Sequence, residues 1–359
     1  MRRIIAIAAL LLTSLYTGHA WADGSAANSP NPSTRYTITD LGSMGLLIEP
    51  TAINDRGQIV GWSQFSDGTM RAFLWQHGKI AKLSVIAGDK TNMASAINNK
   101  GQIVGTSSRT GGVIHAVLWN HGTVINLGSI GSGELSGGSV QAINDAGQII
   151  VNEVSYPNNS FTARLNLALQ HHRVLLCTGN SINNGRLLGR NIVIGIAINN
   201  SGAVVGYHFD NIEHNVHGYL WKNGVTTDLG NFYPSGINAS GVIVGTRKVG
   251  MPPAPTAAIW KNSTLTPLSI PSATRTDGTA INDKEEIIGV TDLVADFGSP
   301  HAALLWRDGN YVDLGNSLLP KDEWTLIHPT AMNNLGQIVG YGKHSGKIAA
   351  FLMTPIVGR

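Results

Sequence analysis

A unit of 39 to 55 residues that recurs along the chain is the feature that most constrains its fold. The unit is clearest over residues 52–83, and its central motif, Ala-Ile-Asn or a close variant, returns six more times. Its asparagines, at spacings of 44, 46, 55, 39, 44 and 51, are Asn54, Asn98, Asn144, Asn199, Asn238, Asn282 and Asn333. Such periods are typical of β-propeller blades and exceed those of leucine-rich repeats.

Each unit predicts four short antiparallel strands. The asparagine ends the first strand and opens a tight turn such as 54–57, whose residues tolerate positive φ. A second strand, a loop of variable length and a third strand follow, and a two-residue turn ending in glycine leads into the fourth. Strands joined by hairpins, without a helical pattern, favour a propeller. A parallel β-helix is the alternative, but its rungs have no two-residue hairpins.

The two ends of the repeat array predict how the ring closes. The seventh unit stops after its third strand, whereas residues 36–42 look like a fourth strand without a blade. Their Asp-Leu-Gly ending matches the fourth strands that end at Gly230 and Gly315. An N-terminal strand that completes the last blade would also remove an exposed sheet edge. We therefore predict an all-β fold, a seven-bladed propeller over residues 36–359.

Several repeat positions predict packing. Tryptophan recurs at one position of the third strand, with Leu169 and Met353 in the other two units; the tryptophans are Trp75, Trp119, Trp221, Trp260 and Trp306. Replacement by Leu and Met favours packing between blades over sugar stacking. Cys177 aligns with the leucine that ends the fourth strand, such as Leu83, so we interpret it as a small buried hydrophobe rather than a nucleophile. Residues 181–189 resemble a truncated repeat start, an inserted hairpin.

The N-terminus predicts export. Arg2 and Arg3 precede a short apolar run, and a small-residue stretch ends Ala20-Trp21-Ala22, which indicates a signal peptide over 1–22 with cleavage after Ala22. Residues 23–35 read as a flexible leader. Removing 22 of 359 residues leaves 23 basic against 22 acidic residues, with no basic cluster. We therefore expect no nucleic-acid partner, no transmembrane segment after cleavage, and a monomer in a periplasmic, secreted or cell-surface location.

The repeated motifs resemble those of the bacterial extracellular HAF-repeat family. The resemblance rests on the Ala-Ile-Asn motif with its following Gly-x-Ile-Val-Gly and on third strands such as 71–75, 115–119 and 217–221, and it covers Tyr36 to the C-terminus. It implies an exported bacterial protein of propeller-like form. It implies no reaction and no catalytic residues, and the histidine that gives the motif its name is missing from several units.

The loops between second and third strands differ most among units, so we expect a site on that face and in its central funnel. The richest loop holds His208, Asp210, Glu213, His214 and His217, a weak candidate for metal binding. A solvated polar loop is the plainer interpretation, and we predict no cofactor and assign no catalytic residue. The aspartates of the tight turns, one per turn and often replaced, indicate turn chemistry rather than calcium sites.

These observations favour an exported, non-enzymatic propeller that binds a glycan, peptide or envelope component through its varied face. The alternative is a hydrolase or lyase that acts on an extracellular polymer in the central funnel. Two carboxylates, or a histidine with an acid, meeting in the funnel would favour that alternative. A purely structural envelope component is the third possibility.

Overall fold

The computed structural model describes residues 35–109, 112–131, 137–155, 171–189, 193–209, 216–249, 254–268, 270, 273, 275–291, 303–318 and 324–356. The predicted signal peptide and nearly all of the predicted leader lie outside these residues. Within the described part of the chain, no helix is long and apolar enough to span a membrane.

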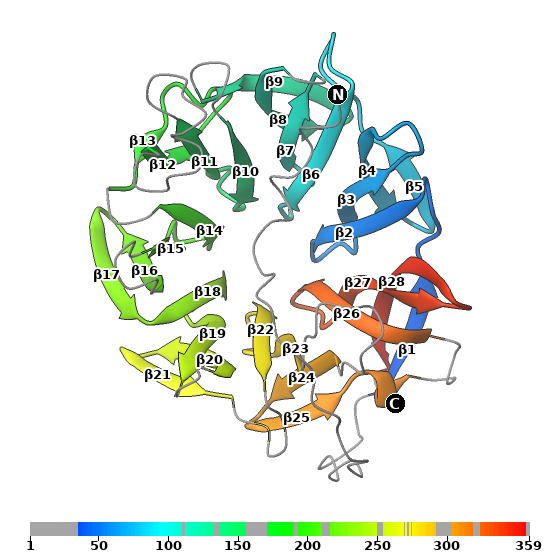
Figure 1. Ribbon diagram of the computed structural model, residues 1–359, viewed down its shortest axis with the longest axis vertical. Coiled ribbons are helices and arrows are strands. Elements are labelled where there is room, and N and C mark those ends of the chain that lie inside the picture. The colour runs from blue at the N-terminus through cyan, green and yellow to red at the C-terminus, as the bar shows by residue number, and fades with distance from the viewer. Residues whose placement is uncertain are drawn as a thin grey trace, which may run out of the picture.

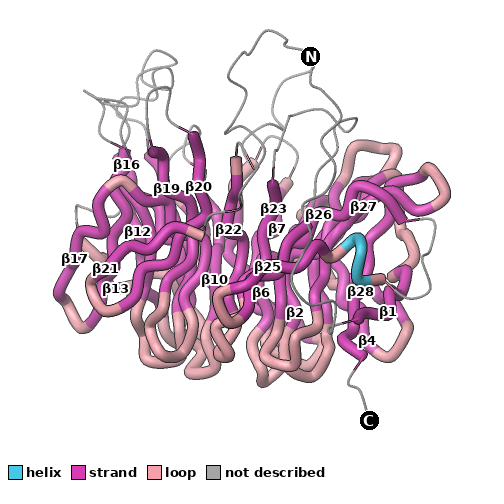
Figure 2. Tube along the Cα trace, turned by 90° about the horizontal axis from the view of Figure 1, so that it is seen from below, coloured by secondary structure: helices cyan, strands magenta, loops and turns pink. Residues whose placement is uncertain are grey.

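Seven four-stranded antiparallel sheets surround a central axis, which confirms the predicted seven-bladed propeller (Figure 1). Seen from the side, short turns of similar shape line the lower edge of the ring (Figure 2). These include the tight turns between first and second strands, such as the turn in which the Gly57 N–H donates to the Asn54 carbonyl oxygen at 3.0 Å.

The first strand of each blade lies nearest the axis and the fourth lies outermost. From blade 1 to blade 7 the first strands are β2 (Leu47–Ile53), β6 (Thr91–Ile97), β10 (Gly137–Ile143), β14 (Ile194–Ile198), β18 (Phe232–Ile237), β22 (Thr276–Ile281) and β26 (Trp324–Met332). The second strands are β3 (Ile59–Gln64), β7 (Ile103–Ser108), β11 (Ile149–Ser155), β15 (Val204–Phe209), β19 (Ile243–Val249), β23 (Ile287–Thr291) and β27 (Ile338–His344).

The two outer strands of each blade follow the same order. The third strands are β4 (Met70–Gln76), β8 (Ile114–Asn120), β12 (His171–Cys177), β16 (Val216–Lys222), β20 (Ala254–Lys261), β24 (Ala303–Arg307) and β28 (Lys347–Ile356). The fourth strands are β5 (Lys79–Lys82), β9 (Thr123–Ile130), β13 (Arg186–Leu187), β17 (Val225–Gly230), β21 (Thr264–Pro267), β25 (Asn310–Asp313) and β1 (Arg35–Asp40). A short 3-10 helix, η3 (Gly315–Ser317), follows β25.

Strand β1 closes the ring as predicted. It pairs antiparallel with β28, from Arg35 opposite Ile356 to Asp40 opposite Phe351. The next residue, Leu41, is buried and donates its backbone N–H to Ala350 at 3.0 Å, as the fourth-strand leucines of other blades do. The chain's N-terminal strand therefore supplies the outer edge of the blade built by its last residues.

The seven motif asparagines form a closed circle of hydrogen bonds between blades, which we call the Asn layer. Each Nδ2 donates to the backbone carbonyl of the equivalent asparagine in the next blade, at 3.0–3.3 Å. The last of these bonds runs from Asn333 back to Asn54 and closes the circle. All seven side chains are buried. An invariant polar residue in the repeat is therefore explained by ring closure, since buried amides need partners.

A β-bulge interrupts the first strand of every blade three residues before the asparagine. Above the bulge the strand lies very close to its neighbour. A Cβ added to Gly61 would come within 2.1 Å of the Glu49 carbonyl oxygen, and one on Gly289 within 2.1 Å of the Asp277 carbonyl oxygen. Only glycine permits such an approach, which explains the recurrent Ile-Val-Gly.

Blade 3 corrects two sequence assignments. Cys177 pairs with Ile149 as Trp119 pairs with Ile103, so it occupies the tryptophan position at the end of the third strand. Leu169, predicted to hold that position, lies outside the described residues. The leucine that ends the fourth strand is Leu188, whose N–H donates to Val174 at 3.0 Å. Residues 181–189 are therefore a lengthened turn and the fourth strand of blade 3, not an inserted hairpin.

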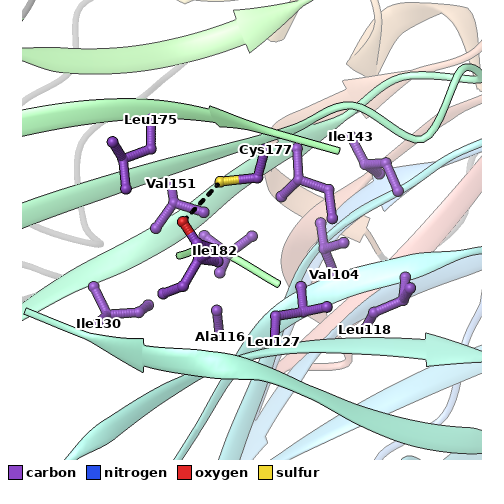
Figure 3. Packing of buried hydrophobic residues seen from close by; sticks show 12 residues of the cluster. Val104, Ala116, Leu118, Leu127, Ile130, Ile143, Val151, Leu175, Cys177 and Ile182 are labelled. Carbon is purple, nitrogen blue, oxygen red and sulfur yellow. Dashed lines mark hydrogen bonds between the residues drawn. The ribbon is translucent and has the colours of Figure 1, made fainter. Parts of the chain in front are cut away.

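The lengthened turn fills the space that a tryptophan fills elsewhere. Ile182 is buried beside Cys177, and its backbone N–H donates to Leu127 of blade 2 at 2.8 Å (Figure 3). The Cys177 thiol lies 4.0 Å from the Ile182 carbonyl oxygen, and burial raises its pKa to about 11. The interpretation of Cys177 as a buried hydrophobe is thus correct, although its position in the blade was not.

The third-strand tryptophans pack inside the ring. Trp75, Trp119, Trp221 and Trp306 are buried, Met353 replaces them in blade 7, and Trp260 is half-buried against the same kind of cluster. The indole N–H of Trp119 also donates to the Ser84 carbonyl oxygen at 2.7 Å. Packing between blades, not exposed stacking, is their role.

Candidate functional site

The predicted metal-binding loop is only partly described. Asp210, Glu213 and His214 lie outside the described residues, whereas His208 and His217 sit opposite each other across β15 and β16. The His217 Nδ1 lies 3.3 Å from a carboxylate oxygen of Asp228 on β17, and both side chains are well exposed. Among the described residues, no three histidine, cysteine or acidic side chains are arranged to hold a metal ion.

The lower mouth of the ring contains a cavity of about 180 Å³ lined by the Asn layer and its flanking residues. The residue after each asparagine forms a second, more exposed set of hydrogen bonds. Asp55, for example, accepts the backbone N–H of Asn334 at 2.8 Å and an amide hydrogen of Asn99 at 3.0 Å. The turn aspartates are thus engaged by neighbouring blades. This face repeats the same asparagine hydrogen bond in all seven blades, and its polar groups hold the blades together.

The opposite end of the inner strands varies in chemistry. Five residues before each asparagine lies a half-buried side chain, and the residue after it is buried in every blade. We call these seven residues the upper layer; in blade order they are Glu49, Met93, Ser139, Ile194, Tyr233, Asp277 and His328. Whereas the Asn layer is invariant, no two upper-layer residues are the same. Seven strands held at one height therefore present seven different side chains around the axis.

The ionisable members of the upper layer stand on three consecutive inner strands. Asp277 belongs to β22, His328 to β26 and Glu49 to β2, which are neighbours in blades 6, 7 and 1 (Figure 1). In each of the three blades a bulge follows two residues later, and a glycine such as Gly61 or Gly289 pairs with the residue in between, so the three side chains stand at the same height. The fold thereby gathers two carboxyl groups and an imidazole that are far apart in sequence.

The surroundings of the two carboxyl groups differ. Burial raises the pKa of Glu49, which favours its protonated form. Asp277 instead accepts a hydrogen bond from the Arg275 guanidinium Nε at 2.9 Å, in an ion pair that lies mostly out of solvent. Two carboxyl groups in unlike environments can act as a proton donor and a charged partner, which is the division of roles that acid–base catalysis requires.

Tyr341 on β27 connects the histidine with the glutamate. Its ring stacks on His328 with centroids 5.0 Å apart and planes 12° from parallel. Burial and, secondarily, the charge of Glu49 raise the pKa of Tyr341, which places the two groups within electrostatic reach. The imidazole is therefore held by a flat aromatic contact at the height of both carboxyl groups, and Tyr341 is a neutral phenol at physiological pH.

An aromatic pair extends this arc into blades 4 and 5. Tyr233, the upper-layer residue next to Asp277, lies against Tyr207 on β15, with ring centroids 5.7 Å apart and planes at 53°. Both rings are half-buried. In blade order the arc thus runs from a tyrosine pair through Asp277 and His328 to Glu49.

A second polar cluster lies between the first two blades. The buried carboxylate of Asp89 accepts a hydrogen bond from the Ser107 hydroxyl at 2.8 Å and lies 3.1 Å from the His115 Nδ1. Although serine, histidine and aspartate meet here, the serine donates to the carboxylate rather than to the imidazole. The cluster therefore lacks the serine–histidine contact of a nucleophilic triad, and we interpret it as a buried support for the loop that leads into β6.

Sequence reasoning missed the upper layer. Glu49, Asp277 and His328 each look like an ordinary strand residue, and they lie in different repeats. The signal was nevertheless present, because aligning the seven inner strands on their asparagines exposes one column, five residues upstream, in which Glu, Asp and His occur together. The sequence analysis predicted a site on the varied loops and in the central funnel, whereas the upper layer lies on the inner strands.

Comparison with known proteins places the fold but not a family. No family model matches the chain, and no curated protein is similar to it in sequence. Among solved structures it is similar to an acylaminoacyl peptidase of Pyrococcus horikoshii, at a TM-score of 0.60 and 10% identity, covering 88% of this chain and 53% of that one. It therefore spans about half the length of that peptidase.

A second similar structure is the β-propeller domain of the Trilobed protease from Pyrococcus furiosus, at a TM-score of 0.55 and 9% identity, covering 90% of this chain and 98% of that one. That domain is described as having an open velcro topology, whereas β1 closes the ring here. Both similar structures belong to proteases. They overturn the expectation of a non-enzymatic binding propeller and favour the hydrolase alternative. At 9–10% identity the likeness itself establishes only the fold.

Proposed function

We propose that this chain is an acid–base enzyme, a hydrolase or lyase that acts on an extracellular polymer at the upper layer. One observation carries the proposal: Glu49, His328 and Asp277 occupy the same height on three consecutive inner strands. Structural repeats tolerate unlike residues at one position when that position contributes little to packing, and here the variation brings together groups that transfer protons.

The environments suggest the roles. Glu49, whose pKa burial raises, supplies the proton to the leaving group as general acid. Asp277, paired with Arg275, is the charged carboxylate that activates a nucleophile or stabilises positive charge. His328, stacked on Tyr341, accepts or relays a proton between them. The half-buried setting of these side chains strengthens their electrostatic effect on a substrate.

The location and assembly form part of the proposal. The basic start, short apolar run and Ala20-Trp21-Ala22 ending support export with cleavage after Ala22, and the repeat motifs support membership of the HAF-repeat family. One complete ring with its own closing strand supports a monomer that needs no second copy for stability. An exported enzyme of this kind would meet polymers outside the cytoplasm.

The test uses the chain from Asp23 onward and a panel of soluble polysaccharides and proteins, with release of reducing ends, unsaturated products or amino groups as readouts. We expect turnover of one polymer class, and a loss of about 10²–10⁴-fold in kcat for Glu49→Gln and Asp277→Asn. Glu285→Gln is the control, because Glu285 lies in the tight turn between β22 and β23, at the other end of the inner strand from Asp277, and pairs there with Lys261 of blade 5.

The pH profile adds a second criterion. A general acid works only when protonated, so activity should fall as pH rises through the raised pKa of Glu49, and the residual activity of Glu49→Gln should lack that limb. Full activity in both carboxyl variants, or no turnover of any polymer by a folded preparation, would overturn the proposal.

A further inference from the structure

The lower mouth of the ring carries a circle of hydrogen bonds that is interrupted in one blade. The residues that follow the asparagines of the Asn layer form what we call the lower rim, with aspartate in three blades, asparagine in three and Ala239 in blade 5. In six blades the backbone N–H of the rim residue donates to the side-chain Oδ1 of the next rim residue, at 2.7–2.9 Å. Alanine has no side-chain oxygen, so the seventh bond, from Asn200 to blade 5, cannot form.

Asn99 shows what an asparagine of the lower rim contributes. Its Oδ1 accepts the backbone N–H of Asp55 in the preceding blade at 2.9 Å. Its Nδ2 donates to the Oδ2 atoms of Asp55 at 3.0 Å and of Asp145 in the next blade at 3.3 Å. One carboxamide thus joins a backbone donor on one side to a carboxylate on the other. Ala239 stands in the same place between Asn200 and Asp283, but its side chain offers no carboxamide.

The two groups that a carboxamide would join in blade 5 are both available. Among the described residues, the Asn200 N–H and the Asp283 Oδ2 have no hydrogen-bond partner. By contrast, the Oδ2 atoms of Asp55 and Asp145 each accept two amide hydrogens. Asn200, Ala239 and Asp283 all line the cavity of about 180 Å³ at the lower mouth, so a molecule in the cavity contacts this part of the rim.

The rest of the cavity indicates what else the ligand contains. The residue before each asparagine of the Asn layer also lines the cavity, and it is isoleucine in six blades and Met332 in the seventh. The cavity therefore combines an apolar wall with a polar rim, a composition typical of small-molecule sites. Three of the described lining residues are aspartates and none is basic, so a neutral ligand suits the cavity better than an anion.

We propose that the lower mouth binds a neutral ligand that carries a primary carboxamide on an apolar group, with the carboxamide beside Ala239. Its oxygen accepts the Asn200 N–H, and its NH₂ group donates to the Asp283 Oδ2, as the Asn99 side chain does between Asp55 and Asp145. The carboxamide belongs either to a small molecule or to an amide side chain of a polypeptide, and the test separates the two. The site lies at the opposite end of the inner strands from the upper layer, so it is independent of the proposed function.

Benzamide is the small-molecule probe, and saturation-transfer NMR of its ring protons measures binding to the chain from Asp23 onward. We expect a dissociation constant of about 1–10 mM, as suits a ligand of this size. Benzoate has nearly the same shape but lacks the amide donor and brings a negative charge toward Asp283, so it should bind at least about tenfold more weakly. Acetyl-Leu-Gln-Leu methyl ester, compared with its Leu-Glu-Leu counterpart, is the polypeptide probe.

Two substitutions test the position of the carboxamide. Ala239→Asn supplies that group from the chain itself, so it should abolish benzamide binding and raise Tm by about 1–2 °C through the added hydrogen bonds. Asp283→Asn keeps the Oδ1 that accepts the Ala239 N–H but removes the available acceptor, and it should weaken binding at least about fivefold. Ala146→Asn is the matched control, because it adds the same side chain at an exposed turn residue outside the cavity and should change binding less than about twofold.

Binding of benzamide alone assigns the site to a small molecule, and binding of the glutamine peptide alone assigns it to a polypeptide. Binding of neither probe, equal binding of benzamide and benzoate, or binding that survives Ala239→Asn in the folded protein would each overturn the inference. If Ala239→Asn failed to fold, Asp283→Asn would decide, since unchanged binding in that variant contradicts the proposed contact. Polymer cleavage should be unaffected by Ala239→Asn, so failure of this site and failure of the proposed function are seen separately.

Discussion

Removal of one member of the Asn layer gives the sharpest test of how the ring is held together. The Asn98 side chain makes four hydrogen bonds: its Oδ1 accepts the N–H groups of Lys100 and Gln102 at 3.1 and 3.0 Å, and its Nδ2 donates to the Gln102 Oε1 at 2.8 Å and the Asn144 carbonyl oxygen at 3.0 Å. The side chain is only 4% exposed. The substitution Asn98→Ala therefore removes one complete inter-blade contact.

The expected cost follows from the groups left behind. Lys100 is exposed, so water can satisfy its N–H, and the Asn144 carbonyl keeps the backbone N–H of Gly147 at 3.0 Å. The Gln102 N–H, however, loses its partner in a partly buried setting. A stranded buried group costs about 1–3 kcal/mol. One such group, together with the lost bond to the Asn144 carbonyl, predicts a loss of about 2–4 kcal/mol in the free energy of unfolding, measured by urea denaturation followed through tryptophan fluorescence.

The neighbouring residue provides a matched control. Asn99 also bridges blades, since its side chain accepts from the Asp55 N–H at 2.9 Å and donates to the carboxylates of Asp55 and Asp145 at 3.0 and 3.3 Å. It is exposed, however, so water replaces these bonds when they are removed, and Asn99→Ala should cost about 0.5–1 kcal/mol. If Asn99→Ala proved as costly as Asn98→Ala, burial of the Asn layer would not be the reason for its stability.

Three further predictions concern the core. Trp119→Ala should lower the free energy of unfolding by about 3–5 kcal/mol, and Trp260→Ala by less, because Trp119 is fully buried and Trp260 half-buried; thermal unfolding of the two variants checks the order. Tyr36→Phe should leave stability unchanged or raise it by up to about 1 kcal/mol, because the described residues offer the buried hydroxyl no hydrogen-bond partner and burial raises its pKa to about 12; a loss above that size in urea denaturation would contradict this. Cys177 should resist iodoacetamide at pH 8 until the protein is unfolded, because it is buried and burial raises the pKa of its thiol; mass spectrometry of the alkylated protein decides.

The fold was predictable because the same local chemistry returns in each blade. Tight-turn residues, hairpin glycines and the recurrent asparagine indicate four-strand units, and the unmatched strand that ends at Gly42 indicates closure. The strand positions of blade 3 were predicted incorrectly for a physical reason. Cys177 with Ile182 occupies the volume that one tryptophan fills elsewhere, and the turn is longer. The cysteine in place of tryptophan and the longer turn compensate for each other in the folded blade. In the sequence, however, they led to Leu169 being assigned to the tryptophan position and Cys177 to the end of the fourth strand.

The candidate site was harder to predict because its residues share no local pattern. Catalytic motifs are recognised when spacing along one helix or loop sets the geometry, but here geometry comes from the ring. Asp277 and Glu49 are 228 residues apart and carry no common motif. Their relation appears only when each is counted from its own blade's asparagine. In repeat proteins, residues at equivalent positions of different repeats should therefore be compared with one another, in addition to residues that are neighbours along the chain.

Scaffold and chemistry occupy different heights of the same seven strands, and this separation is itself testable. The Asn layer fixes the distance between neighbouring inner strands, and glycines such as Gly61 and Gly289 let the upper layer lie close to the second strand. Half-buried upper-layer side chains contribute little to that frame and are free to differ. Substitutions in the Asn layer should therefore lower stability in every blade alike, whereas substitutions in the upper layer should affect activity only in the arc from Tyr233 through Asp277 and His328 to Glu49. Met93→Leu, outside that arc at the same height, should change neither. A strong loss of activity in Met93→Leu with unchanged stability would mean that the reacting groups extend around the whole ring.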